Sequence, residues 1–169
     1  MDSFIAQLGC RARLIVRQVS TATSNTERGT QLTTEIDWKT DGSGLVLGAN
    51  IHDGLLEGIS YHSAQRLSFN IRSTGGDVFS FVAEGIAHLN IVELWEAMIV
   101  GELFAWRLGA VPTYSFGQAA RTLFKGRYSE EQTQRLRESM PDALLVEVTS
   151  SYGGSIFLIC DRLKAYRQA

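Results

Sequence analysis

The sequence predicts an α+β fold, made of a mainly antiparallel β-sheet of about seven or eight strands and two helices near residues 115–140. Three observations lead to this prediction. Apolar and polar residues alternate in several short stretches, glycine-containing turns separate those stretches, and helical spacing occurs in one region only. A chain of 169 residues has the length of one domain, so we expect residues 1–169 to form a single unit.

The first expected elements are two strands, at 11–21 and 31–38. The segment between them is polar and ends in glycine, which is typical of a long hairpin loop. Residues 39–50 contain three glycines and are expected to form a connection. Residues 1–49 are therefore predicted to form an N-terminal hairpin extension.

The next four expected strands lie between residues 54 and 108. The first runs from about Leu55 to Tyr61, and the second and third, at 67–72 and 79–84, alternate around the tight-turn sequence Thr-Gly-Gly-Asp. The fourth, at 98–108, is apolar on both faces. We therefore expect it to lie centrally in the sheet or under a helix.

Helical spacing appears after these strands. The stretch 115–126 carries one apolar face, formed by Phe116, Ala119, Ala120, Leu123 and Phe124. The stretch 129–140 begins with Ser-Glu-Glu-Gln, the pattern of a capping box, and Pro141 ends it. This second helix has little apolar surface and is expected to be exposed.

The C-terminal part returns to strands, at 144–149 and 155–160, joined by a turn at 151–154. The second of them is apolar on both faces and is expected to be central. Cys160 lies in this strand, and we expect it and Cys10 to be reduced thiols, since a secreted disulfide scaffold would carry more cysteines.

Composition excludes several classes of function. The net charge is −2, from 16 basic and 18 acidic residues, whereas nucleic-acid-binding domains are usually basic. The N-terminus lacks the basic start and apolar run of a signal peptide, and no apolar run approaches the ~20 residues of a membrane span. We expect a cytoplasmic protein that binds neither nucleic acid nor membrane.

The pair His52-Asp53 could carry chemistry, because adjacent His and Asp residues serve as metal ligands in some hydrolases. The sequence favours a structural pair, in which Asp53 accepts backbone N–H bonds and His52 orients a turn, although binding stays open. No nucleophile signature or phosphate loop occurs, and the glycines at 42–48 miss the dinucleotide spacing. We therefore expect no catalytic, cofactor-binding or metal residues and no enzymatic activity.

Charge is segregated along the chain. Residues 84–102 contain Glu84, Glu93, Glu96 and Glu102 without Lys or Arg, and residues 121–137 are mainly basic. The carboxylates either face solvent separately or form an acidic patch for a basic partner. Glu102 lies inside an apolar strand, where an unpaired charge is costly, so Arg107 or Arg72 is its expected partner.

Aromatic residues offer a candidate contact surface. Phe104 and Trp106 share one strand face and are expected to be core residues. Trp95 lies in a loop-like stretch and is a candidate partner anchor. With its neighbours it gives the candidate protein interface Glu93, Trp95 and Glu96.

Residues 50–160 resemble a known family. The opening Asn-Ile-His-Asp-Gly-Leu-Leu-Glu-Gly-Ile at 50–59, the segment Phe-Val-Ala-Glu-Gly-Ile at 81–86 and the ending Ser-Tyr-Gly followed by an apolar strand and Cys160 are similar to bacterial immunity proteins of polymorphic toxin systems, in particular immunity family fifty and related uncharacterised families. Ile51 and Gly54 depart from the pattern, and 113–140 looks like an insertion. The resemblance implies a non-catalytic protein that binds and occludes a cognate toxin.

Two hypotheses of different classes follow. The first is this immunity protein, with the toxin as its protein partner. The alternative is a small-molecule-binding or structural module with a cleft near His52, Asp53 and Glu57, which a ligand-dependent rise in Tm, lost in His52→Ala, would support. An enzyme has no motif in support, and this hypothesis would gain weight if His52, Asp53 and Glu102 shared one pocket. A homodimer formed by pairing of free strand edges also stays open.

Overall fold

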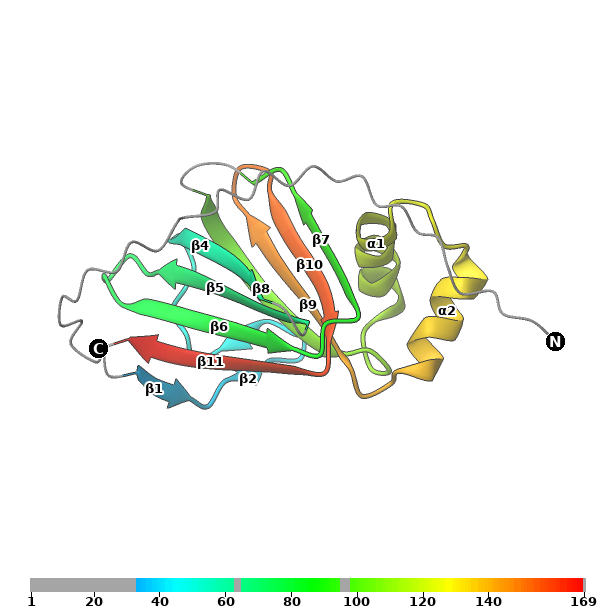
Figure 1. The fold of residues 1–169 in the computed structure, drawn as a ribbon, viewed down its shortest axis with the longest axis horizontal. Helices are drawn as coiled ribbons and strands as arrows, with labels where there is room; N and C mark the ends of the chain where they lie inside the picture. Colours follow the sequence, from blue (N-terminus) through cyan, green and yellow to red (C-terminus); the bar gives the residue numbers. More distant parts are fainter. Residues whose placement is uncertain (1–32, 63–64, 95–97, 169) are drawn as a thin grey trace.

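The computed structural model describes residues 33–62, 65–94 and 98–168, and these form an α+β fold. A nine-stranded antiparallel sheet has the order β1-β11-β6-β5-β4-β8-β9-β10-β7, and a two-stranded sheet pairs β2 with β3 (Figure 1). Two helices lie at one end of the large sheet (Figure 1). The fold class predicted from the sequence is confirmed.

The large sheet consists of two halves. The first half contains β1 (Thr33–Ile36), β11 (Arg162–Gln168), β6 (Val78–Glu84), β5 (Arg66–Arg72) and β4 (Gly54–His62). The second half contains β8 (Ile99–Arg107), β9 (Leu144–Ser150), β10 (Ser155–Cys160) and β7 (His88–Val92). The small sheet is formed by β2 (Lys39–Thr40) and β3 (Val46–Leu47).

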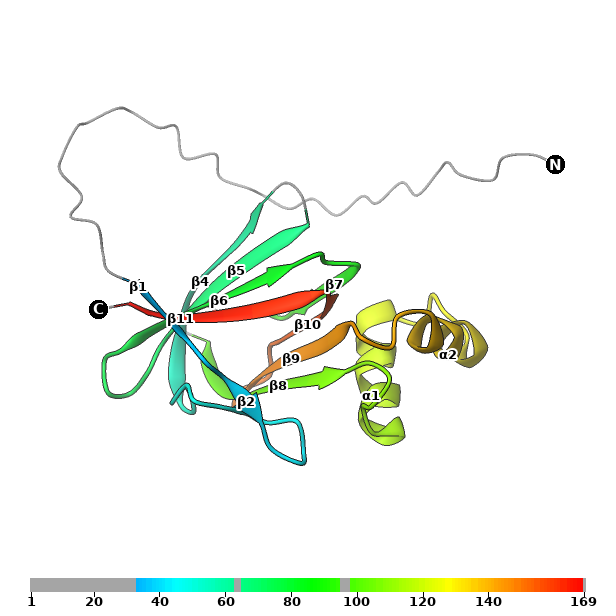
Figure 2. The same ribbon diagram turned by 90° about the horizontal axis from the view of Figure 1, so that it is seen from below.

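The two halves fold toward each other around one core (Figure 2). On one side β4 pairs with β8 through Gly54 and Leu55 only. On the other side β6 continues into β7 and β10 into β11, and the bonds Asp161 N–H to Glu84 O (3.0 Å) and Ala87 N–H to Ile159 O (2.9 Å) carry the ladder around this corner. Glycine is required at position 85, because its φ is +67° and an added Cβ would overlap the Asp161 carboxylate.

The main core lies between the halves. Leu67, Phe69 and Ile71, the apolar set of the predicted alternating strand, are fully buried. Phe69 faces Phe81 across the β5–β6 pair, and their rings stack at 5.1 Å between centroids. The same cluster includes Val146 of the second half. Burying one such side chain contributes roughly 1.5–3 kcal/mol, so this shared core holds the two halves together.

The helix α1 (Thr113–Phe124) covers the outer face of the second half. All five residues of its predicted apolar face are buried, in a second cluster with Leu145, Phe157 and Ile159. This cluster explains why strands β8 and β10 are apolar on both faces: one face meets the main core and the other meets α1 or its surroundings.

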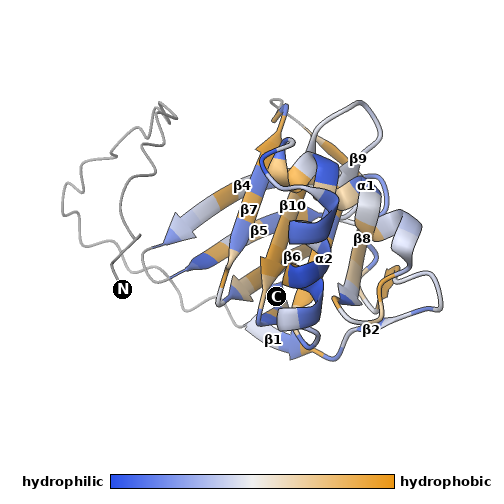
Figure 3. Cartoon of the chain, turned by 90° about the vertical axis from the view of Figure 1, so that its right-hand side faces the viewer, coloured by the Kyte–Doolittle hydropathy of each residue, from blue (hydrophilic) through white to orange (hydrophobic). Residues whose placement is uncertain are grey.

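The helix α2 (Glu130–Ser139) has no buried residue, as expected, and Figure 3 shows that most of its residues are hydrophilic. Its capping box is formed, with the Ser129 hydroxyl accepting from Gln132 N–H and the Gln132 side chain accepting from Ser129 N–H. Arg137 fastens the helix to the segment before α1 by donating to the carbonyls of Leu108 (3.0 Å), Gly109 (3.3 Å) and Val111 (2.6 Å). Its guanidinium also lies over the Phe116 ring.

Several elements differ from the expectations. β7 and β11 were not predicted, and the expected connection 39–50 contains the short strands β2 and β3. The predicted strand 31–38 contains β1, which pairs with β11, whereas the predicted strand 11–21 lies outside the described residues. Cys160 is fully buried as expected, and burial raises the pKa of its thiol to about 12. Cys10 also lies outside the described part of the chain.

Candidate functional site

A bulge in β8 organises the region around His52. Register shifts between Val100 and Leu103, so Gly101 and Glu102 do not follow the regular ladder with β9. The Thr149 hydroxyl compensates by contacting both the N–H (3.0 Å) and the carbonyl (3.3 Å) of Glu102. Bulges of this kind occur frequently beside functional sites, because they redirect side chains and backbone groups.

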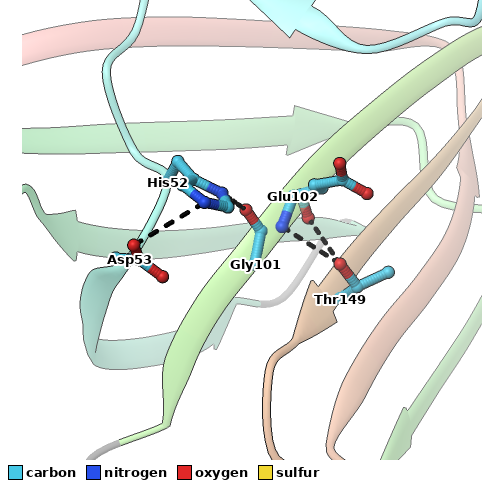
Figure 4. Close-up of polar contacts among 5 residues, drawn as sticks. All are labelled: His52, Asp53, Gly101, Glu102 and Thr149. Atoms are coloured by element: carbon cyan, nitrogen blue, oxygen red, sulfur yellow. Dashed lines mark hydrogen bonds and ion pairs between the residues drawn. The ribbon is translucent and has the colours of Figure 1, made fainter.

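The His52 side chain forms a hydrogen bond with the Gly101 backbone carbonyl at this bulge. Its Nδ1 lies 2.6 Å from Gly101 O, and Figure 4 shows the ring directed at that carbonyl. A carbonyl only accepts hydrogen bonds, so Nδ1 carries the proton and Nε2 faces Asp53 Oδ2 at 3.6 Å. Both side chains are more than half exposed, which leaves Nε2 accessible to solvent.

Asp53 shapes the turn through its backbone. Its φ is +57°, and its N–H donates to Val100 O at 2.9 Å, rather than its carboxylate accepting the backbone bonds expected from the sequence. The next residue, Gly54, has to be glycine, because an added Cβ would lie within 2.9 Å of the carbonyl oxygens of Ile51 and Arg72. The His52 imidazole and the Asp53 backbone thus both contact β8 from the turn before β4.

The hairpin of β2 and β3 forms the wall opposite this turn. Asp41 Oδ1 accepts from the Ser43 hydroxyl (2.6 Å) and from Leu45 N–H (2.9 Å), and the Ser43 hydrogen bond holds the pKa of this carboxyl below its ordinary value. Ser43 O in turn accepts from Trp106 Nε1 (2.7 Å). Gly44 passes so close to Trp106 that an added Cβ would lie 1.9 Å from the indole nitrogen.

Between the hairpin and the bulge lies a hollow of about 480 Å³. It is lined by the segment 45–51, His52, Gly101, Glu102 and Leu103. Asp53 is not among the lining residues, and the Glu102 carboxylate extends away from the imidazole (Figure 4). The structure therefore places His52 and Glu102 beside one hollow without directing their side chains at a common point.

The expected partners of Glu102 were wrong. Glu102 is exposed, because the bulge lies on the outer face of β8, and it needs no buried partner. Arg72 pairs with Glu57 at 2.6 Å, and Arg107 lies 3.8 Å from Asp142. Glu57 is thereby engaged on β4 and is not among the residues lining the hollow proposed for His52.

The same outer face carries a half-buried carboxylate. Glu147 lies between its cross-strand partners Phe104 and Phe157, and burial, together with the nearby Glu102 charge, raises the pKa of Glu147. Phe104 and Trp106, expected to be core residues, stack at 5.1 Å and are only half-buried. Of the two, Trp106 packs against the second cluster.

A second surface lies at the tip of the second half, where β7 and β9 end and β10 begins. Glu93 is exposed with a φ of +48°, and its carbonyl lies against Gly154, where an added Cβ would approach to 2.5 Å. Leu94 and Tyr152 are 48% and 77% exposed at this tip. The other two residues of the candidate interface, Trp95 and Glu96, lie outside the described residues.

Sequence reasoning did not assign Tyr152, Leu94 or Thr149 to a site. The sequence placed Tyr152 only in a turn. The Thr149 hydroxyl accepts from Glu102 N–H because of a bulge in β8 that no local sequence pattern predicts. Within 33–62, 65–94 and 98–168, no group of three or more His, Cys, Asp or Glu residues is arranged to hold a metal ion. None of the helices described is long and apolar enough to cross a membrane.

Comparison with known proteins gives no match: no family model, no curated protein and no solved structure is significantly similar to this chain.

Proposed function

We propose that this chain is a non-catalytic protein-binding module, an immunity protein that neutralises a cognate bacterial toxin by occluding it. The tip of the second half carries this proposal. There Glu93, Leu94 and Tyr152 are all exposed, and the Glu93 carbonyl lies against Gly154 of the turn that carries Tyr152. An exposed aromatic and an exposed aliphatic residue next to a carboxylate have the composition of a binding hot spot with a charged rim.

The tip also extends the interface expected from the sequence. Glu93 belongs to that interface, and Trp95 and Glu96 follow Leu94 directly in the sequence. Tyr152 adds a second aromatic anchor from a turn nearly 60 residues away, brought close by the packing of Gly154 against the Glu93 backbone. A basic surface on the toxin would be attracted to Glu93 and Glu96 and would be covered by the tip.

The test is co-expression with the product of the adjacent gene, followed by size-exclusion chromatography. We expect a stable co-eluting complex, weakened at least about ten-fold by Tyr152→Ala, because a buried aromatic hot spot contributes about 2 kcal/mol. Glu93→Lys is expected to slow association, since it replaces attraction by repulsion. Tyr61→Ala is the matched control, because Tyr61 is 59% exposed on β4, away from the tip.

Equal loss of affinity in Tyr152→Ala and Tyr61→Ala would refute the tip as the interface. Elution of the chain alone, beside a neighbour without toxin activity, would refute the immunity function itself. In that case the hollow beside His52 becomes the leading site. Its volume of about 480 Å³ lies within the usual range for small-molecule pockets, and the exposed Nε2 of His52 offers one polar contact.

A further inference from the structure

The two helices form a further surface, distinct from the tip, that neither the resemblance nor the sequence motifs assigned. A groove of about 610 Å³ lies between α1 and α2. Its floor is apolar and includes Phe116, Gly117 and Ala120 of α1. Tyr114 and Tyr128 lie among its lining residues and are 76% and 40% exposed. Tyrosine at the margin of an apolar pocket is typical of protein-recognition surfaces.

Gly117 keeps the groove open. It lies inside α1, where glycine destabilises a helix relative to alanine. A Cβ at this position would meet no atom within 4 Å, so close packing does not require the glycine. Its φ is also not in the left-handed region, so backbone geometry does not require it. The space above Gly117 therefore belongs to the groove.

The charge around the groove is positive. Arg121 and Glu130 both line it, and Lys125 and Arg127 follow at the end of α1. Over residues 113–139, which include both helices, five cations oppose three carboxylates, a net charge of +2. None of Arg121, Lys125 and Arg127 forms an ion pair with any residue that the structure describes. Arg127 instead donates from Nε to Phe124 O, which keeps it at the end of α1.

From this combination we infer that the α1–α2 groove binds an acidic segment of a protein partner, which inserts an apolar side chain above Gly117 and places carboxylates near Arg121, Lys125 and Arg127. The apolar floor favours a protein segment over a nucleic acid, and so does the net charge of −2 on the whole chain. The inference goes beyond the proposed function and shares with it only the existence of a protein partner. The acidic tip and this basic groove would then bind oppositely charged parts of that partner.

The probe is a fluorescein-labelled random copolymer of Glu and Tyr, titrated with the full chain and followed by fluorescence anisotropy. We expect saturable binding that weakens with added salt, and weaker binding of a Lys–Tyr copolymer of equal length. Arg121→Glu is expected to raise the Kd about five-fold, since an exposed ion pair is lost and repulsion replaces it. Arg66→Glu makes the same change of charge on β5, in the first half of the sheet, and should change the Kd less than about two-fold.

Gly117→Leu tests the groove without endangering the fold. Leucine is a better helix former than glycine, so this variant should melt no lower than the wild type while filling the groove and raising the Kd about five-fold or more. The inference is overturned if the copolymer does not bind, or if Gly117→Leu and Arg121→Glu bind it as the wild type does. It is also overturned if an oligo-dT strand binds more tightly, or if the chain self-associates through the groove and Arg121→Glu restores a monomer.

These outcomes separate the two proposals. Copolymer binding that depends on Gly117, without a complex with the neighbouring gene product, would refute the immunity proposal and leave the groove. A complex with that product that depends on Tyr152, without copolymer binding, would refute the groove alone.

Discussion

Arg137→Ala is expected to loosen α2 far more than its position on an exposed helix suggests. The guanidinium of Arg137 donates to three carbonyls between Leu108 and Val111 and lies 5.3 Å from the centroid of Phe116. Hydrogen bonds from charged groups contribute about 1.5–3 kcal/mol each when buried, and these bonds are only partly buried. After solvent screening, the three bonds and the ring contact together should contribute about 2–3 kcal/mol.

Arg135 provides the matched control. It lies two residues earlier on the same helix, and its described contact is an exposed i,i+4 pair with Glu131, worth about 0.3–0.5 kcal/mol. Arg135→Ala should therefore lower Tm by about 1–2 °C, and Arg137→Ala by about 5–10 °C. Arg137→Lys should recover less than half of the loss, because an ammonium group lacks the planar fork that reaches several carbonyls.

The assay is thermal unfolding followed by circular dichroism, together with amide hydrogen exchange of α2. Faster exchange of the α2 amides in Arg137→Ala, with β9 and β10 unchanged, would locate the loss at the contact between α2 and the segment before α1. If Arg137→Ala and Arg135→Ala lose equal stability, the three carbonyl bonds do not fasten α2, and the reasoning is wrong. The groove between α1 and α2 would then lack a fixed wall.

Two further predictions concern pH. Burial raises the pKa of Glu147, so the folded state binds this proton more tightly than the unfolded state. The free energy of unfolding therefore falls as pH rises from about 4 toward neutrality. At pH 8, Glu147→Gln should need more urea to unfold than the wild type, and the difference should shrink at low pH. The pH dependence from His88 has the opposite direction, because burial against Phe124 and Tyr128, and secondly the Arg127 charge, lower the pKa of His88. The wild type should therefore lose stability as pH falls below about 6.5. If urea unfolding shows the same loss in His88→Gln, the assignment to His88 is wrong.

The local elements were predictable because their signals lie within a few residues. The buried face of α1, the capping box at Ser129 and the turn between β5 and β6 each follow from spacing or from turn residues close in the sequence. The strands missed were those without such a signal. β7 is half-buried throughout, and β11 places charged and apolar residues on a strand that follows β10 after a single residue, Asp161.

The candidate site was predictable only in part. The sequence drew attention to His52 and Glu93, because an adjacent His-Asp pair and a run of carboxylates are visible without a fold. It could not show that His52 is engaged by the Gly101 carbonyl, or that Tyr152 lies at the same tip as Glu93. Those contacts depend on a bulge and on strand pairing over many residues.

The sequence by itself therefore determined the α+β class, the amphipathic face of α1 and the alternating faces of the central strands, because these follow from the period of apolar residues along the chain. Only the tertiary structure decided that β1 pairs with β11 and that the sheet folds back at Gly85 and Asp161. It also decided which exposed residues share the tip and the groove. The physical reason is that pairing between distant strands is selected by the burial of one common core, which no short stretch of sequence contains.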